Sequence, residues 1–138
     1  MRGCDFLDTS VLLYGLDTSQ PAKQRIAREL TSKAVAGEGV ISTQVLAEFA
    51  ATLLQKFERQ YAPGDVITIL ESGEPIPLIQ PDGDMVRRAV EAHRAYGILF
   101  YDGMIVAAAE RAGCEKIWSE DLNAGQKYFG VQVENPFA

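Results

Sequence analysis

Four acidic side chains occupy positions from which they could bind a metal ion: Asp8, Glu48, Asp102 and Asp121. Each one ends, opens or interrupts an apolar segment of the chain. Carboxylates are costly next to a protein core unless a positive charge pairs with them. No Lys or Arg occurs within the three positions after Asp8, Glu48 or Asp102. A divalent cation is therefore a natural candidate for the missing positive charge.

Short apolar segments alternate with segments of helical length, and these elements must position the acids. Strands are expected at 4–7, 40–41, 76–79, 115–118 and 131–133. Helices are expected over about 19–36, 44–57, 63–70, 83–96 and 102–113. This pattern predicts one α/β domain over residues 1–138, with three α/β/α layers and a central parallel sheet of about five short strands.

Several polar residues and glycines predict where the helices begin and end. Ser19 is a candidate N-cap before Pro21, and Asp82 is the expected N-cap of the helix that Gly97 closes. Ser42 or Thr43 caps the helix that carries Glu48.

The predicted sheet brings the four acids to one place. Ligands of open α/β sheets bind outside the carboxyl ends of the strands. Asp8 and Asp121 lie at two such ends, Asp102 lies at a helix N-terminus facing the same edge, and Glu48 lies in the second turn of a helix that enters from a strand there. Acids far apart in sequence are thus expected to meet.

Each acid also has an ordinary structural explanation. Asp8 could cap the turn that follows it, and Asp102 could be an N-cap or a first-turn acid favoured by the helix dipole. Asp121 could form an Asx-turn, and Glu48 could be a solvated residue at the border of an apolar face. The metal-site interpretation therefore depends on the set and its common edge, not on any single member.

Composition limits the function classes without selecting one. A net charge of -6 normally argues against a nucleic-acid partner. Because four of the acids belong to the candidate site, the charge neither supports nor excludes a polyanionic substrate. Asp5 and Asp8 break the N-terminal apolar stretch, so no signal peptide is expected, and no apolar run is long enough to span a bilayer.

The two cysteines, Cys4 and Cys114, are far apart in sequence and outside any C-x-x-C spacing. They predict neither a zinc site nor a disulfide framework, which fits a reducing cytosol. Other chemistries lack their residues: the chain has a single histidine, His93, and neither a G-x-S-x-G elbow nor a P-loop. The basic residues expected to be solvated or to meet phosphates are Arg87, Arg88, Arg94, Arg111 and Lys127.

Four segments of the chain resemble, in order, the motifs of PIN-domain ribonucleases. They are 6–12 around Asp8, 42–49 around Glu48, 101–109 around Asp102 and 119–126 around Asp121. Together they bracket nearly the whole chain, whose length is similar to that of the VapC toxins of prokaryotic toxin–antitoxin pairs. Gly103 departs from the pattern, since many relatives carry Ala there, and it is expected to loosen the helix start without removing a ligand.

The resemblance implies a metal-dependent endoribonuclease that hydrolyses RNA and acts as the toxin of a type II pair. It implies that Mg²⁺ or Mn²⁺ is held by the acids Asp8, Glu48, Asp102 and Asp121. It also implies that the hydroxyls of Ser10 and Ser119 position the substrate. Glu120 stands beside Asp121, and either carboxylate could be the fourth to face the metal.

The resemblance further implies a homodimer, a cytoplasmic location, and an antitoxin partner with an Arg or Lys able to enter the acidic pocket. Leu53, Leu54 and Phe57 could form part of an antitoxin surface, although core packing explains them equally well. Two other function classes stay open: another metal-dependent phosphodiesterase, phosphatase or DNA nuclease, and a PIN-like binding module without activity. A phosphatase would usually carry D-x-D after the first strand, and a binding module would usually lack one of the acids.

Overall fold

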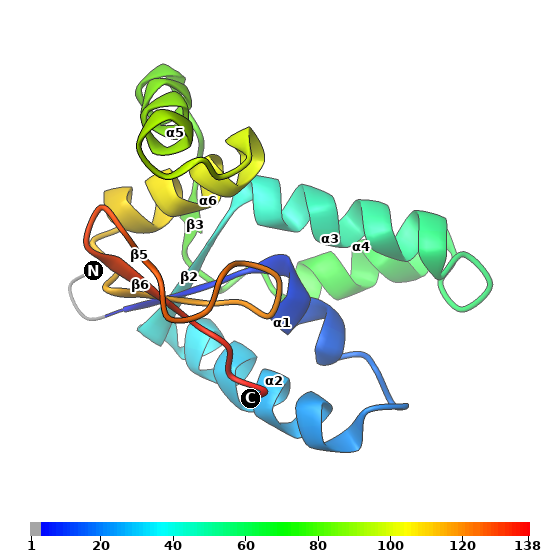
Figure 1. Cartoon of the computed structure of the whole chain (residues 1–138). Helices are drawn as coiled ribbons and strands as arrows, with labels where there is room; N and C mark the ends of the chain where they lie inside the picture. Colours follow the sequence, from blue (N-terminus) through cyan, green and yellow to red (C-terminus); the bar gives the residue numbers. More distant parts are fainter. Residues whose placement is uncertain (1–3) are drawn as a thin grey trace.

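A six-stranded sheet runs through the middle of the computed structural model, which describes residues 4–138 (Figure 1). The strand order is β3-β2-β1-β4-β6-β5. The strands are β1 (Asp5–Leu7), β2 (Gly39–Ser42), β3 (Leu78–Ile79), β4 (Lys116–Trp118), β5 (Lys127–Tyr128) and β6 (Val131–Glu134). Every neighbouring pair is parallel except β5 with β6. The predicted central parallel sheet is confirmed, and β5 adds a sixth strand at its edge.

Helices cover both faces of this sheet, which confirms the predicted three-layer architecture. They are α1 (Thr9–Tyr14), α2 (Pro21–Lys33), α3 (Thr43–Lys56), α4 (Pro63–Ser72), α5 (Gly83–Tyr96) and α6 (Phe100–Arg111). In Figure 1, α5 and α6 lie above the sheet and α2 lies below it. A π-helical turn, η1 (Ala34–Glu38), extends α2 and leads into β2. Within residues 4–138, no helix has the length and apolar character needed to cross a membrane.

Most of the predicted helix ends are confirmed by their capping contacts. Asp82 accepts a hydrogen bond from the Met85 N–H at 3.0 Å, and Gly97 ends α5 in the left-handed conformation with φ of 72°. Ser42 accepts a hydrogen bond from the Val45 N–H at 3.3 Å and so caps α3. These contacts fix the start of α3, which carries Glu48, and both ends of α5, which precedes α6.

The predicted N-cap of α2 is wrong. The residue before Pro21 is Gln20, and its side chain makes no capping hydrogen bond. Ser19 bonds instead to Asp17, whose Oδ1 accepts hydrogen bonds from both the Ser19 N–H and the Ser19 hydroxyl. The Ser19 hydroxyl therefore takes part in a local turn with Asp17 and does not cap the helix.

The edge strand β5 belongs to a tight hairpin whose turn has no recognisable signal in the sequence. Lys127 pairs with Gln132, and Tyr128 pairs with Val131, so the turn between the strands contains two residues. Both turn residues have positive φ, 50° at Phe129 and 82° at Gly130. A two-residue turn of this kind usually uses Asn-Gly or Asp-Gly. Phe129 gives no such signal, which explains why the strand was missing from the prediction.

Cys4 and Cys114 form a disulfide, which contradicts the expectation of two unpaired thiols. They lie just before β1 and β4, which are adjacent parallel strands. Their Cα atoms are consequently 5.0 Å apart despite a sequence separation of 110 residues. Spacing along the chain cannot reveal a pairing that the sheet order creates, and these cysteines lend no support to a reducing compartment.

Gly103 lies where α6 passes closest to α5. A Cβ atom built on Gly103 would lie 2.7 Å from the carbonyl oxygen of Ala89 and 3.1 Å from its Cα. Contacts below 3.0 Å with backbone require one of the helices to shift. The glycine is therefore a packing requirement of this chain, which is a different role from the loosened helix start expected from its sequence.

We expect Gly103→Ala to lower the free energy of unfolding by about 1–3 kcal/mol, because the added methyl group overpacks the α5–α6 contact. Gly64→Ala is the matched control, since a Cβ at Gly64 in the first turn of α4 would meet nothing within 4 Å. Both substitutions replace a helical glycine by alanine and so gain similar helix propensity. The difference between their free energies of unfolding, measured by urea denaturation, therefore reports the steric clash at Gly103. Equal unfolding free energies for the two variants would contradict this account.

Candidate active site

Two of the four acids lie side by side because their strands are neighbours. Leu7 pairs with Trp118 at the carboxyl ends of β1 and β4, and the Asp8 N–H donates to the Trp118 carbonyl oxygen at 3.0 Å. Asp8 and Ser119 therefore leave the sheet together, and Asp121 follows two residues later. Strand pairing thus places this part of the site at the predicted edge.

The other two acids come from helices that begin at the same edge. Glu48 lies in the second turn of α3, which follows β2 directly, and Asp102 lies in the first turn of α6. Gln44 joins the two helices: its Nε2 donates to Glu48 Oε1 at 2.7 Å and to the Tyr101 carbonyl oxygen at 3.1 Å. Leu99, not Asp102, occupies the N-cap position of α6, so the carboxylate of Asp102 does not serve as an N-cap.

Asp8 is the most deeply placed of the four carboxylates, with a relative exposure of 7%. Its Oδ2 accepts a hydrogen bond from the Ser119 hydroxyl at 2.6 Å, and its Oδ1 accepts one from the Thr9 N–H at 2.8 Å. The second contact makes Asp8 the N-cap of α1. Asp8 therefore caps α1 and also belongs to the acid cluster.

Ser119 organises the loop that carries the fourth acid. It is fully buried, and its hydroxyl oxygen accepts hydrogen bonds from the N–H groups of Asp121 and Leu122, each at 3.1 Å. Because the same hydroxyl donates to Asp8, it couples the end of β1 to the loop after β4. Ser10 is also buried, and its oxygen accepts a hydrogen bond from the Glu120 N–H at 3.1 Å. Both predicted hydroxyls thus lie at the acid cluster and hold its loop.

The carboxylates act on one another electrostatically. Burial raises the pKa of Asp8 to about 6, and the charges of Asp121 and Glu48 add to the rise against the hydrogen bonds from Ser119 and Thr9. Burial also raises the pKa of Asp102, again with contributions from Glu48 and Asp121. Among residues 4–138, no Lys or Arg forms an ion pair with any of these acids. The cluster is a set of like charges without a cationic partner.

Glu120 and Asp121 have different surroundings, which bears on the choice of fourth acid. Glu120 accepts hydrogen bonds from the Tyr14 hydroxyl at 2.6 Å and from Lys23 Nζ at 2.7 Å. The hydrogen bonds from Lys23 and then Tyr14 lower the pKa of Glu120. Asp121 instead raises the pKa of both Asp8 and Asp102. The geometry therefore favours Asp121 as the member of the cluster and assigns Glu120 to an ion pair with α2.

The sequence interpretation missed four residues that support the site. Thr9 donates from its hydroxyl to Glu48 Oε2 at 3.3 Å, and Gln44 fixes Glu48 from one helical turn earlier. The spacing of Gln44 and Glu48, four residues apart on a helix, was a signal that could have found this pair. Tyr14 and Lys23, which hold Glu120, carry no such signal because they are about a hundred residues away from it.

The donor set of the cluster consists of carboxylate oxygens, which suits hard divalent cations such as Mg²⁺ and Mn²⁺. The buried carboxylate of Asp8, which has hydrogen bonds but no ion-pair partner in residues 4–138, is the strongest observation in favour of such an ion. In the described part of the chain, no three His, Cys, Asp or Glu side chains stand close enough to hold one ion together. Binding would therefore require the exposed Glu48 and Asp121 side chains to move toward Asp8.

We expect the burial of Asp8 to make the metal-free protein less stable as the pH rises. The pKa of Asp8 is about 6 in the folded state and 3.8 in the reference state, so the folded state binds its proton more tightly. Proton binding by Asp8 therefore stabilises the folded state by on the order of 3 kcal/mol below pH 4. This contribution to the free energy of unfolding is lost as the pH rises from about 4 to about 6.

The measurement compares urea denaturation of the wild type and Asp8→Asn in EDTA over this pH range. The unfolding free energy of the wild type should fall relative to that of the variant as the pH rises from 4 to 7. Parallel pH profiles for the two proteins would mean that Asp8 is not a destabilising buried charge.

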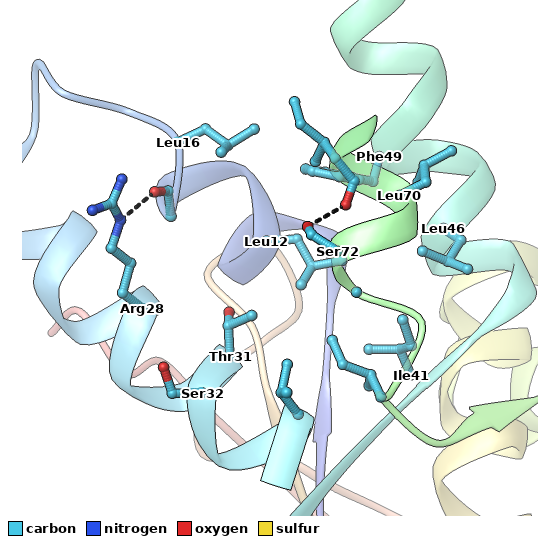
Figure 2. A pocket seen from close by; sticks show the side chains of 15 residues that line it. Leu12, Leu16, Arg28, Thr31, Ser32, Ile41, Leu46, Phe49, Leu70 and Ser72 are labelled. Carbon is cyan, nitrogen blue, oxygen red and sulfur yellow. Dashed lines mark hydrogen bonds between the residues drawn. The ribbon is translucent and has the colours of Figure 1, made fainter. Parts of the chain in front are cut away.

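An apolar groove of about 470 Å³ lies between α1, α2, α3 and α4 (Figure 2). Its walls include Leu12, Leu16, Leu46, Phe49 and Leu70. Polar side chains at the groove bond to backbone. Arg28 Nε donates to the Gly15 carbonyl oxygen at 2.9 Å, and the Ser72 hydroxyl donates to the Ile69 carbonyl oxygen at 2.6 Å (Figure 2). The Thr31 hydroxyl donates to the Ala27 carbonyl oxygen at 2.9 Å. None of the four acids lines this groove. It is thus an apolar surface separate from the acid cluster.

Comparisons with known proteins give one family match and solved structures with the same fold. The model of the PIN domain matches residues 6–129. A DNA-bound VapBC from Salmonella typhimurium is 16% identical with a TM-score of 0.71, over 97% of this chain and 98% of that chain. A toxin–antitoxin complex from Klebsiella pneumoniae is 16% identical with a TM-score of 0.67, over 96% and 97%.

A third solved structure with the same fold is that of Mycobacterium tuberculosis VapC20, a toxin that cleaves the sarcin-ricin loop. It is 17% identical with a TM-score of 0.67, over 93% of this chain and 98% of that chain. No curated protein matches the chain. The similarity to solved structures therefore establishes a common fold.

Proposed function

The chain belongs to the PIN domain family, and on this premise we propose that it is an endoribonuclease that depends on Mg²⁺ or Mn²⁺. The observation that carries the proposal is the buried carboxylate of Asp8, which has no ion-pair partner in residues 4–138 and whose pKa is raised by burial and by the charges of Asp121 and Glu48. Nucleases of this family generally use divalent ions. The oxygen donors of this chain suit the same ions.

In the proposed site, Asp8, Glu48 and Asp102 would hold the metal ion, and Asp121 would orient water or help to hold a second ion. A bound ion would lower the pKa of water and offset negative charge on the scissile phosphate. The remaining residues act on these ligands. Ser119 fixes one oxygen of Asp8, while Thr9 and Gln44 fix the two oxygens of Glu48. Because Glu48 and Asp121 have to move toward Asp8 for an ion to bind, Asp8 with Ser119 is the fixed part of the proposed site.

Cleavage by the purified protein tests this proposal. We expect single-stranded RNA to be cut in Mg²⁺ or Mn²⁺ and to stay intact in EDTA. Cutting of DNA but not RNA would favour the alternative of a DNA nuclease. Absence of both cutting and metal binding would favour a PIN-like binding module.

We also propose that the protein is the toxin of a toxin–antitoxin pair, with an antitoxin helix seated in the apolar groove of Figure 2. Solved complexes of two proteins with this fold support an antitoxin partner. The groove is lined mainly by aliphatic side chains, which come from α1, α3, α4 and neighbouring segments, while α2 contributes Arg28, Thr31 and Ser32. An apolar wall of this kind is the surface that an amphipathic helix requires. A basic residue of the same antitoxin would reach the acid cluster and supply its missing charge.

Co-expression with the product of a neighbouring gene tests the partner. Val35 lines the groove with a relative exposure of 39%, so Val35→Asp should abolish co-purification of the partner. Ile67→Asp is the control, because Ile67 is 56% exposed on α4 but does not line the groove. Equal loss in both variants, or none in either, would contradict this docking site. Leu53 is only 1% exposed and belongs to the core, so it contributes no antitoxin contact.

The resemblance to VapC toxins extends the proposal to a homodimer in the cytoplasm, where its RNA substrate is found. Light scattering of the purified protein should give about twice the chain mass of 15.1 kDa. A mass equal to that of one chain would remove the dimer from the proposal and leave the nuclease assignment unchanged.

A further inference from the structure

The loop that follows β4 lies along α1 and is held there by three hydrogen bonds. Ser119 donates to Asp8, the N-cap of α1, at 2.6 Å. The Glu120 N–H donates to the Ser10 hydroxyl oxygen at 3.1 Å, and the Glu120 carboxylate accepts a hydrogen bond from the Tyr14 hydroxyl at 2.6 Å. Asp8, Ser10 and Tyr14 are the N-cap, the second residue and the last residue of α1, so the contacts span the whole helix.

A lysine from α2 completes the contact at the far end of α1. Lys23 Nζ donates to Glu120 Oε2 at 2.7 Å and to the Tyr14 hydroxyl at 3.2 Å, and it lies 4.6 Å from the centroid of the Tyr14 ring. The side chains of Lys23 and Glu120 are 32% and 27% exposed, less than any other side chain in an ion pair of residues 4–138. We call Tyr14, Lys23 and Glu120 together the Glu120 anchor.

The anchor fixes the chain one residue before Asp121 and leaves the Asp121 side chain free. Leu122, on the other side, is buried, and its N–H donates to the Ser119 hydroxyl oxygen. Asp121 itself is exposed, and residues 4–138 offer its carboxylate no ion-pair partner. An ion among the acids requires Asp121 to move toward Asp8. With its backbone held on both sides, Asp121 can make this movement with its side chain alone.

We propose that the Glu120 anchor positions Asp121 for the metal ion, while Glu120 itself stays outside the metal site. This inference rests on the proposed function. Lys23 holds the Glu120 carboxylate on the side of α2 and the loop backbone along α1. A loop that is already ordered loses less conformational freedom when its ligand binds. Lys23 and Tyr14 are therefore positioning residues that act through Glu120.

Hydrogen exchange measured by NMR tests the anchor in the absence of metal and RNA. Lys23→Met removes the cation but keeps an unbranched side chain, and it should speed exchange of the Glu120 and Asp121 amides by about tenfold through easier opening of the loop. The amides of Gln132 and Val133 on β6 should keep their rates, because their hydrogen bonds lie outside the loop contacts with α1. A general loss of stability would instead speed all four amides.

The matched control is Lys33→Met. Lys33 is exposed at the end of the same helix and forms no ion pair within residues 4–138. This variant should leave every exchange rate unchanged. Lys23→Arg keeps a cation beside Glu120 and should restore slow exchange of the loop.

Binding of Mn²⁺, followed by electron paramagnetic resonance of the free ion, tests the consequence for the metal. Lys23→Met should weaken binding by about tenfold, the usual effect of losing a group that orients a metal ligand. Asp121→Asn should also weaken binding. Adding Lys23→Met to Asp121→Asn should cause no further loss, because the lysine acts through Asp121.

The outcomes separate the anchor from the proposed function. Tighter Mn²⁺ binding by Lys23→Met would show that the released Glu120 joins the acids, and it would overturn the proposal. An equal loss with and without the Asp121 carboxylate, or an unchanged loop exchange rate, would overturn it as well and leave the metal site standing. If the wild type binds no Mn²⁺, the proposed function fails and the role of the anchor toward a metal fails with it, while the exchange rates still decide whether the anchor holds the loop.

Discussion

Asp8→Asn should lower the rate of RNA cleavage by about 10²–10⁴-fold, because it removes a charge that the proposed metal ion requires. Asparagine has nearly the shape of aspartate and can still accept the hydrogen bond from the Thr9 N–H that caps α1. The loss should therefore appear in kcat while the variant stays folded. The measurement is the initial rate at which single-stranded RNA is cleaved in saturating Mg²⁺.

Asp5→Asn is the control for this substitution. Asp5 opens β1, three residues before Asp8, and accepts a hydrogen bond from Trp118 Nε1 at 2.9 Å; it is not one of the four acids. Its asparagine variant should cleave RNA at nearly the wild-type rate. Full activity of Asp8→Asn would remove Asp8 from the proposed metal site.

Ser119→Ala should lower metal-dependent activity by about 10–100-fold, the usual effect of removing a group that orients a metal ligand. The Ser119 hydroxyl donates a hydrogen bond to Asp8 at 2.6 Å and accepts hydrogen bonds from the N–H groups of Asp121 and Leu122. Its loss frees the Asp8 carboxylate and the loop that carries Asp121. Because the ligands remain, higher Mg²⁺ concentrations should restore part of the activity.

A Mg²⁺ titration of the cleavage rate separates this role from a general loss of folding. The Ser119→Ala curve should shift to higher Mg²⁺, whereas Ser72→Ala, which removes an exposed hydroxyl on α4, should overlay the wild type. A Ser119→Ala curve of reduced height at an unchanged midpoint would argue against a role through the metal ligands.

The fold was predictable wherever one segment carried its own signal. Asp82 and Gly97 mark the ends of α5 by their types alone, and the alternation of short apolar strands with helices predicts the parallel sheet. Features that depend on two distant segments were not predictable in this way. The pairing of Cys4 with Cys114 follows from the neighbouring places of β1 and β4, and the hairpin turn at Phe129 follows from a positive φ that its residue type does not favour.

The site shows the same division. Strand-end logic predicts that Asp8 and Asp121 share an edge, and the structure places the loops that carry them together through Ser119. The choice between Glu120 and Asp121 could not be made from sequence, because it depends on Lys23 approaching from α2. The role of Gly103 was equally hidden, since it depends on the backbone of Ala89 in another helix.

The most direct test of the central claim is an anomalous difference map from a crystal of this protein soaked in Mn²⁺. We expect a peak within coordination distance of Asp8 and Asp102, with Glu48 and Asp121 drawn toward it. Asp8→Asn crystals treated in the same way should lack the peak. A wild-type map with no peak at these carboxylates, or with a peak only elsewhere, would contradict the claim that the four acids form a metal site.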